Sequence, residues 1–236
     1  MSWVHVLEHH ASRTPDKAFA VFEGETVSYG QMTRRVAAVA GGLAARGVVA
    51  GDVVALLSFN NTEFLVTMFA ASYLGAIAMP LNWRLAAPEL RYILGHSQAR
   101  ALVCDDSLLR LGDEATRELS GILRVAVSSA RRDGWELFAD LSGRSTLASA
   151  RRRTGGDDVQ RLMYTSGTTG RPKGVMITNA NVAWKNYAHV TEFGFTSADV
   201  GLACGPLYHV GALDLVTTSM IAVGATTIIH RTFDAA

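Results

Sequence analysis

Residues 164–174 read Tyr-Thr-Ser-Gly-Thr-Thr-Gly-Arg-Pro-Lys-Gly, and the prediction of both fold and function starts from this stretch. Glycine permits positive φ and lets backbone N–H groups approach a ligand closely, and consecutive N–H groups in such a turn form a concave anion site. Lys173 adds a positive charge on a flexible stem, which suits phosphate. Short hydroxyl donors are supplied by Thr165, Ser166, Thr168 and Thr169. The stretch therefore predicts a phosphate-binding loop.

Two other interpretations of this loop are disfavoured. The Walker pattern needs four residues between its first glycine and a Gly-Lys-Ser/Thr ending, whereas here Gly167 and Gly170 are three apart and Lys173 precedes Gly174. A P-loop NTPase, and with it a kinase or an unrelated NTPase, fits poorly. A polar β-turn without a ligand is also disfavoured, because ten specific positions follow an apolar run.

The residues before the loop alternate between strand and helix patterns. Residues 28–31 form a capping-box pattern, and apolar residues then recur at helical spacing up to Leu43. A strand over 53–59, a helix over 63–74 and a strand over 76–81 follow, which is a β-α-β unit with parallel pairing. The alternation continues with a helix over 88–94, a strand over 100–104, a helix over 108–119 and a strand over 123–127. We predict an α/β fold of layered, parallel-rich sheets flanked by helices.

Residues 128–158 interrupt this alternation. They are rich in Ser, Gly, Arg and Asp and include three consecutive arginines at 151–153. We predict that residues 1–127 form a layered β-α-β region and that 128–158 form a surface connection with at most one short helix.

Composition excludes several classes of partner. The chain of 236 residues is 49% apolar, carries 18% charged residues and has a net charge of +1, so no nucleic acid partner is implied. Cys104 and Cys204 form neither a disulfide framework nor a metal-ligand spacing, which favours a reducing, cytoplasmic setting. His5 and His9 lie four apart, but a surface or capping role is favoured over a metal pair.

The best candidate for a transmembrane segment is residues 64–81, which are mostly apolar. Gly75 and Pro80 interrupt this stretch, so a buried helix followed by a buried strand explains it better. We predict no transmembrane segment.

The stretch 164–175 resembles the phosphate loop of the adenylate-forming superfamily, which includes acyl-CoA synthetases, aryl-CoA ligases, luciferases and peptide-synthetase adenylation domains. Three further segments are similar to that family, namely 27–32, 74–82 and 206–211. Residues 82–85, Asn-Trp-Arg-Leu, are closer to fatty-acyl and aryl-CoA ligases than to peptide-synthetase domains.

The resemblance implies an activity. Members of this family use ATP and Mg²⁺ to convert a carboxylic acid, here a fatty or aryl acid, into its acyl-adenylate and then form a thioester with coenzyme A. By this resemblance Lys173 would help to hold the phosphates, Thr165 would contribute to the Mg²⁺ environment, and His209 would act beside the carboxylate as a catalytic residue. The β- and γ-phosphates would be cradled by Thr165, Ser166, Gly167, Thr168, Thr169 and Gly170.

Other aromatic residues are candidates for the wall of the acyl pocket. Tyr208 precedes His209, while Trp184 and Tyr187 share a face of the helix expected after the loop. For Trp184 and Tyr187, ordinary core packing is the favoured interpretation. Cys204 is interpreted as a small core residue rather than a nucleophile.

The family's pattern continues beyond residue 236, with segments for adenine, ribose and Mg²⁺ and a small C-terminal domain. We therefore expect this chain to be the incomplete, N-terminal part of an adenylation domain, with 159–236 as its phosphate-loop and acyl-site region and with the C-terminal domain absent. The chain alone is expected to be weakly active or inactive. A catalytically silent nucleotide-binding fragment, a carrier protein as acyl acceptor and a homodimeric assembly all remain open.

Overall fold

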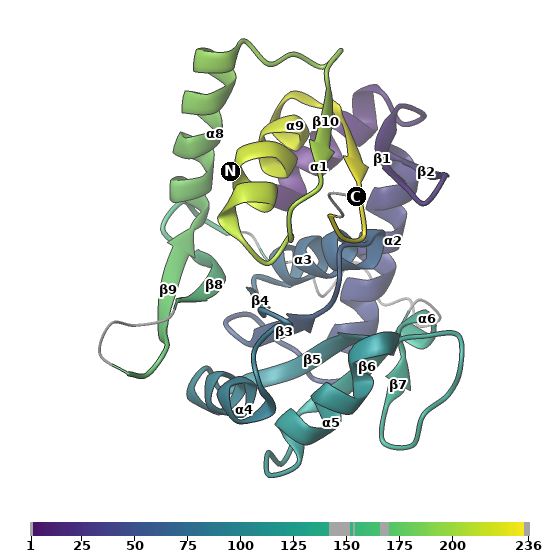
Figure 1. The fold of residues 1–236 in the computed structure, drawn as a ribbon. Helices are drawn as coiled ribbons and strands as arrows, with labels where there is room; N and C mark the ends of the chain where they lie inside the picture. The colour runs from purple at the N-terminus through teal and green to yellow at the C-terminus, as the bar shows by residue number, and fades with distance from the viewer. Residues whose placement is uncertain (1, 142–151, 153, 166–169, 234–236) are drawn as a thin grey trace.

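The computed structural model describes residues 2–141, 152, 154–165 and 170–233, which form two sheets with helices packed between and beside them (Figure 1). The helices are α1 (Trp3–Arg13), α2 (Tyr29–Ala44), α3 (Thr62–Leu74), α4 (Ala87–His96), η1 (Asp106–Leu108), α5 (Leu109–Thr116), α6 (Phe138–Leu141), α8 (Asn179–Phe193), η2 (Gly211–Thr217) and α9 (Thr218–Val223). The strands are β1 (Ala18–Phe22), β2 (Glu25–Ser28), β3 (Val53–Leu57), β4 (Ile77–Pro80), β5 (Ala99–Asp105), β6 (Leu123–Val127), β7 (Glu136–Leu137), β8 (Val159–Thr165), β9 (Lys173–Thr178), β10 (Val200–Ala203) and β11 (Thr226–Ile229).

The larger sheet has the order β7-β6-β5-β3-β4-β8-β9. All of its neighbouring strands are parallel except β8 and β9, which form an antiparallel hairpin at one edge. The predicted α/β class and the parallel β3-α3-β4 unit are therefore confirmed. Parallel strands end at the same edge of a sheet, so the ends of β4 and β8 lie side by side.

Local sequence signals set the boundaries of the main helices. The Ser28 side chain accepts a hydrogen bond from the Gln31 N–H, and the Gln31 side chain accepts one from the Ser28 N–H, as the capping box predicts. Asn61 caps α3 by accepting from the Phe64 N–H at 2.7 Å, and Gly75 ends that helix with φ +69°.

Both faces of the larger sheet are buried at its centre, in β3. In β3, Val54 and Leu56 pack into a core with α2 and α3, whereas Ala55 and Leu57 pack into a second core with α4 and α5. Every residue of β3 is buried, which is the pattern of a central parallel strand covered by helices on both sides.

The smaller sheet has the order β10-β11-β1-β2 and was not predicted as a separate unit. Its core residues, such as Phe19, join the core of α2 and α3, so these helices lie between the two sheets (Figure 1). Strand β1 pairs in parallel with β11, from the other end of the described chain. Helix α1 packs on α2 and α3 and was likewise not predicted.

The predicted surface connection also contributes to the core. Strand β7 extends the larger sheet beside β6, and the side chains of Trp135 and Leu141 are buried. Helix α6 is a short helix in the described part of this segment.

The apolar stretch 64–81 folds as predicted into α3, a turn at Gly75 and β4. Among the described residues, no helix combines the length and apolar character that crossing a membrane requires.

Candidate active site

The phosphate-binding loop predicted from the sequence connects β8 and β9 of the edge hairpin. Thr165, the last residue of β8, pairs across the hairpin with Lys173, the first residue of β9. Gly170 has φ +106°, and a Cβ atom there would meet no atom within 4 Å, so the backbone is both left-handed and open on that side. The Lys173 side chain is exposed and forms no ion pair with any described residue.

The Tyr164 side chain links this hairpin to α4 through a contact with His96. Its hydroxyl lies 2.7 Å from Nδ1 of His96, and its ring lies against Gly174, where an added Cβ would come within 3.1 Å of the ring. Partial burial raises the pKa of the Tyr164 hydroxyl. A side chain at position 174 would therefore make a tight contact with this ring, which would have to shift by a few tenths of an ångström.

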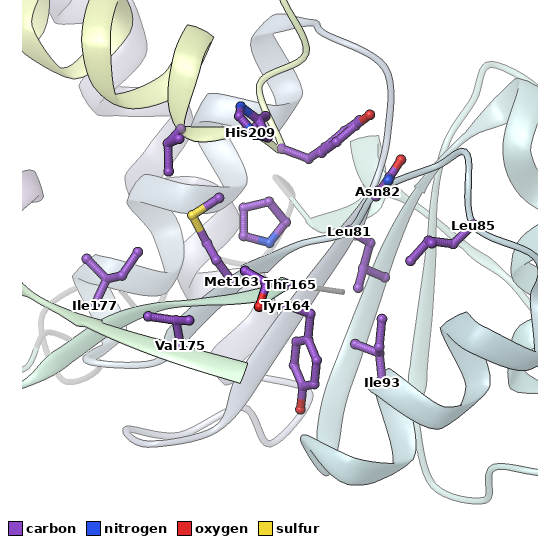
Figure 2. A pocket seen from close by; sticks show the side chains of 13 residues that line it. Leu81, Asn82, Leu85, Ile93, Met163, Tyr164, Thr165, Val175, Ile177 and His209 are labelled. Atoms are coloured by element: carbon purple, nitrogen blue, oxygen red, sulfur yellow. The ribbon is translucent and has the colours of Figure 1, made fainter. Parts of the chain in front are cut away.

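A cavity of about 380 Å³ opens beside the start of the loop (Figure 2). Its wall is mostly apolar and is formed by the end of β4, by β8 and β9, and by the segment before η2. The lining residues are Pro80, Leu81, Asn82, Leu85, Ile93, Met163, Tyr164, Thr165, Val175, Ile177, Tyr208, His209 and Val210. Thr165 and His209, which were predicted separately from two motifs, therefore share one cavity.

His209 is held by a short turn before the π-helix η2. Its Nδ1 accepts a hydrogen bond from the Gly211 N–H at 3.2 Å, so in the neutral ring the proton lies on Nε2. The imidazole is exposed and lies at the cavity (Figure 2). It can therefore donate a hydrogen bond from Nε2 to an oxygen of a bound ligand.

Asn60 fixes the backbone of the segment that carries His209. This side chain is 3% exposed. It accepts from the Leu207 N–H at 2.8 Å and donates to the carbonyl oxygens of Gly205 at 2.8 Å and His230 at 2.9 Å. Asn60 thus ties the segment to the end of β3.

Tyr208 lies in the wall of the same cavity. Its hydroxyl accepts a hydrogen bond from Arg84 Nη1 at 2.8 Å, and the Arg84 guanidinium lies 4.4 Å from the centre of the Trp83 ring. The segment 82–85 is therefore linked to the segment that carries His209.

The structure brings some of the predicted site residues together and leaves others untested. Thr165 and His209 line the cavity, whereas Gly170 and Lys173 lie on the loop side of the hairpin outside its lining. Ser166, Gly167, Thr168 and Thr169 lie outside the described residues.

The interpretation of Trp184 and Tyr187 as core residues was wrong. They are 72% and 65% exposed, and they pack against each other on α8 with ring centroids 6.0 Å apart. Helix α8 turns a different face, with Val182 and Lys185, toward the rest of the described chain. Neither aromatic residue lines the cavity beside Thr165.

No metal cluster was predicted at His5 and His9. Nδ1 of His5 lies 2.7 Å from the Ser2 hydroxyl at the start of α1, and His9 is exposed. Among the residues that the structure describes, no group of three or more His, Cys, Asp or Glu side chains could hold a metal ion.

Several residues that shape the site were not predicted from the sequence. Asn60 lies outside the motifs described above, and the partnership of His96 with Tyr164 joins residues that are 68 positions apart. Arg161, in the apolar run before the loop, is 1% exposed and pairs with Asp214. A basic residue in such a run was the one available signal for this pair.

Comparison with known proteins identifies relatives over nearly the whole chain. A sequence profile described as "AMP-binding enzyme" matches residues 7–236. The chain is 36% identical over 230 residues to indoleacetate–CoA ligase of Aromatoleum aromaticum, covering 97% of this chain and 45% of that protein. It is 38% identical over 224 residues to feruloyl-CoA synthase of an Amycolatopsis species, covering 94% of this chain and 43% of that protein.

Comparison with solved structures also identifies similar proteins. The N-terminal domain of FACL13 from Mycobacterium tuberculosis superposes with a TM-score of 0.85 and 30% identity, covering 99% of this chain and 58% of that one. The chain thus spans less than half the length of the two curated relatives described above.

Proposed function

Because the chain belongs to the AMP-binding enzyme family, we propose that it forms part of an enzyme that activates a carboxylic acid with ATP and transfers the acyl group to coenzyme A. One observation carries this proposal. Thr165, at the start of the glycine-rich loop, and His209, from a separate motif, line the same cavity of about 380 Å³. A phosphate-binding loop and a hydrogen-bond donor beside an apolar cavity suit a reaction between a nucleotide and an organic acid.

The loop has the features that a triphosphate requires. The open, left-handed backbone at Gly170 allows close approach of phosphate oxygens, and the ammonium of Lys173 supplies a positive charge opposite Thr165. We assign the phosphates of ATP to Thr165, Gly170 and Lys173. Ser166, Gly167, Thr168 and Thr169 complete the proposed cradle by their position in the sequence.

Mg²⁺ is expected to accompany ATP and to neutralise part of its charge. The ion prefers oxygen ligands and usually binds through one or two carboxylates together with substrate phosphates. In the described part of the chain, the Thr165 hydroxyl is a suitable donor beside the loop, and carboxylates do not cluster there. We propose that Thr165 contacts the ion and that the phosphates provide further ligands.

The proposed reaction has two steps. An oxygen of the acid's carboxylate attacks the α-phosphorus of ATP. The bond from that phosphorus to the oxygen shared with the β-phosphate breaks, and pyrophosphate leaves. The thiol of coenzyme A then loses its proton to solvent, its sulfur attacks the acyl carbon, and the bond from that carbon to the AMP oxygen breaks so that AMP leaves. The Lys173 ammonium offsets repulsion between the carboxylate and the phosphates, and the Nε2–H of His209 orients the carboxylate by donating a hydrogen bond.

The apolar wall of the cavity suits the organic part of the acid, with Leu81, Ile93 and Met163 among its lining residues. The relatives named for indoleacetate and ferulate support an aryl acid. A fatty acid is the alternative, and the experiment includes both classes.

Acid-dependent exchange of labelled pyrophosphate into ATP tests the proposal. The full-length gene product is incubated with a panel of aryl and fatty acids, and coenzyme A is added in a second series to detect the thioester. We expect exchange only in the presence of an acid, and thioester formation with the same acid. Exchange that is independent of every acid, or no exchange at all, would contradict the proposal.

A further inference from the structure

A second cavity, of about 350 Å³, lies between the β8–β9 hairpin, α8 and η2. It shares Ile177 and Val210 with the cavity beside Thr165, so the two are adjacent. In Figure 2, Ile177 lies at the end of the first cavity opposite Leu85. The lining residues of the second cavity are Arg161, Ile177, Asn181, Val182, Lys185, His189, Val210, Asp214 and Leu215.

This second cavity differs from the first in its charges. Arg161, Lys185 and His189 are basic, and Asp214 is the one acidic residue among the lining residues. With His189 neutral, two cations face one carboxylate, which leaves one positive charge in excess. Burial lowers the pKa of His189, and the Lys185 cation acts in the same direction, which favours the neutral imidazole.

Two hydrogen-bond donor atoms of Arg161 have no partner among the described residues. Its side chain is 1% exposed, and Nη2 donates to both carboxylate oxygens of Asp214 at 2.8 Å. Its Nε and Nη1 atoms are buried and have no hydrogen-bond partner in the described part of the chain. Buried donors of a charged group without partners are costly, so these two atoms point to a missing acceptor.

Lys185 is already engaged and holds the opposite wall in place. Its Nζ donates to the Asp214 carbonyl oxygen, the Asn186 side-chain oxygen and the Thr218 hydroxyl. The lysine therefore fixes η2, which carries Asp214, against α8. Lys185 is thus engaged, whereas Nε and Nη1 of Arg161 have no partner among the described residues.

We propose that the second cavity binds an oxygen acceptor at the far end of the acid, a ketone carbonyl or a second carboxylate, through Nε and Nη1 of Arg161. This inference rests on the proposed function, because it assumes that the first cavity places the activated carboxylate beside Thr165 and His209. A plain alkyl end would cover the charged groups without supplying an acceptor, so the lining discriminates against it. The substrate class is then an acid with a second, remote oxygen function.

Matched pairs of acids test this assignment with the full-length gene product. In each pair, one acid has a C=O group at the carbon position where the other has a CH₂ group. Successive pairs place this difference at successive carbon positions of the acid. A second series replaces the terminal methyl by a carboxylate. The readout is the ratio of kcat/KM values within each pair, measured by acid-dependent pyrophosphate release. We expect the oxygen-bearing acid to be preferred by about 10-fold or more at one position.

Two variants assign the preference to Arg161. Arg161→Lys keeps a cation beside Asp214 but lacks the guanidinium donors, and Arg161→Met/Asp214→Leu removes both charges so that neither is left unpaired. Both are expected to reduce the preference to within about 3-fold. Arg46→Met/Glu136→Leu, which removes an ion pair at the β7 edge of the larger sheet, opposite the β8–β9 hairpin, is the matched control and should retain the preference.

The outcomes separate the two proposals. Activation of acids without any preference in the wild-type protein overturns the second cavity as a recognition site but leaves the proposed function intact. If the folded Arg161→Lys variant keeps the preference, the ion pair only holds β8 against η2. That result would also overturn the second cavity as a recognition site. Failure to activate any acid overturns both.

Discussion

His209 is the residue whose proposed role follows most directly from its hydrogen bonds. Because the Gly211 N–H occupies Nδ1, the neutral ring presents Nε2–H to the cavity. His209→Ala should therefore lower kcat/KM for acid-dependent pyrophosphate release by about 10-fold or more. His230→Ala is the control, since that side chain is exposed and only its backbone oxygen contacts Asn60. An equal effect of the two substitutions would remove His209 from the reaction.

The residues that the sequence predicts are those whose partners are close in the chain or whose motif is distinctive. Ser28 caps a helix through Gln31, three positions away, and Thr165 lies in a distinctive motif. Asn60 and Arg161 were not predicted, because their partners are 53 to 170 positions away. Only the fold brings such partners together.

At the scale of elements, the contact between α2 and α6 depends on one glycine. A Cβ atom at Gly42 would lie 2.3 Å from the Leu141 carbonyl oxygen, which is backbone and cannot move freely. Gly42→Ala should therefore reduce the free energy of unfolding by about 1–3 kcal/mol, despite the better helix propensity of alanine. Denaturant unfolding monitored by circular dichroism measures this change.

Gly95→Ala is the matched control in α4. Its Cβ would meet the Leu119 side chain at 3.6 Å, an ordinary contact, and the site is exposed. This variant should be as stable as the wild-type protein or up to about 1 kcal/mol more stable, because alanine favours the helix. A loss of stability equal to that of Gly42→Ala would show that helix packing at residue 42 is not the cause.

The elements with clear periodicity and caps were predicted within a few residues, as for α3, β4 and β6. The smaller sheet was missed because β1 and β2 are short and their pairing with β11 is not local. Residues 128–158 were assigned wholly to the surface because of their polar composition, although Trp135 and Leu141 are buried. The average composition of a segment does not reveal single apolar residues that are buried.

At the scale of the whole molecule, Lys185 makes stability depend on pH. Burial lowers the pKa of its ammonium to about 8, with Asp214 opposing and Arg161 reinforcing the shift, from an ordinary value of 10.5. Between these two values the unfolded chain binds a proton that the folded chain has released, so this group's contribution to stability rises with pH.

Comparison with Lys185→Met isolates this contribution, because methionine does not titrate and the other ionisable groups are common to both proteins. The free energy of unfolding of the wild-type protein, relative to this variant, should increase from pH 7.5 to pH 10. Denaturant titrations across this range measure the difference. A difference that is constant or decreases with pH would show that the Lys185 pKa is not lowered by folding.

The order of layers could be predicted only in part. The alternation of strands and helices in the sequence predicts a sheet with helices beside it. The position of α2 and α3 between two sheets depends instead on contacts between the two ends of the described chain. The adjacency of the loop and His209 depends on the same arrangement, together with the Asn60 tie to the end of β3.

The affinity for MgATP, with and without the Lys173 ammonium, tests the central claim most directly. Equilibrium binding is measured by calorimetry for the full-length wild-type protein, Lys173→Ala and the charge-matched control Arg110→Ala, whose side chain is 90% exposed on α5. Since a hydrogen bond to a charged group contributes about 1.5–3 kcal/mol, Lys173→Ala should raise the Kd about 10- to 100-fold, with the control unchanged. Equal affinities in all three proteins, or no binding of MgATP to the wild-type protein, would contradict the assignment of this loop to the phosphates.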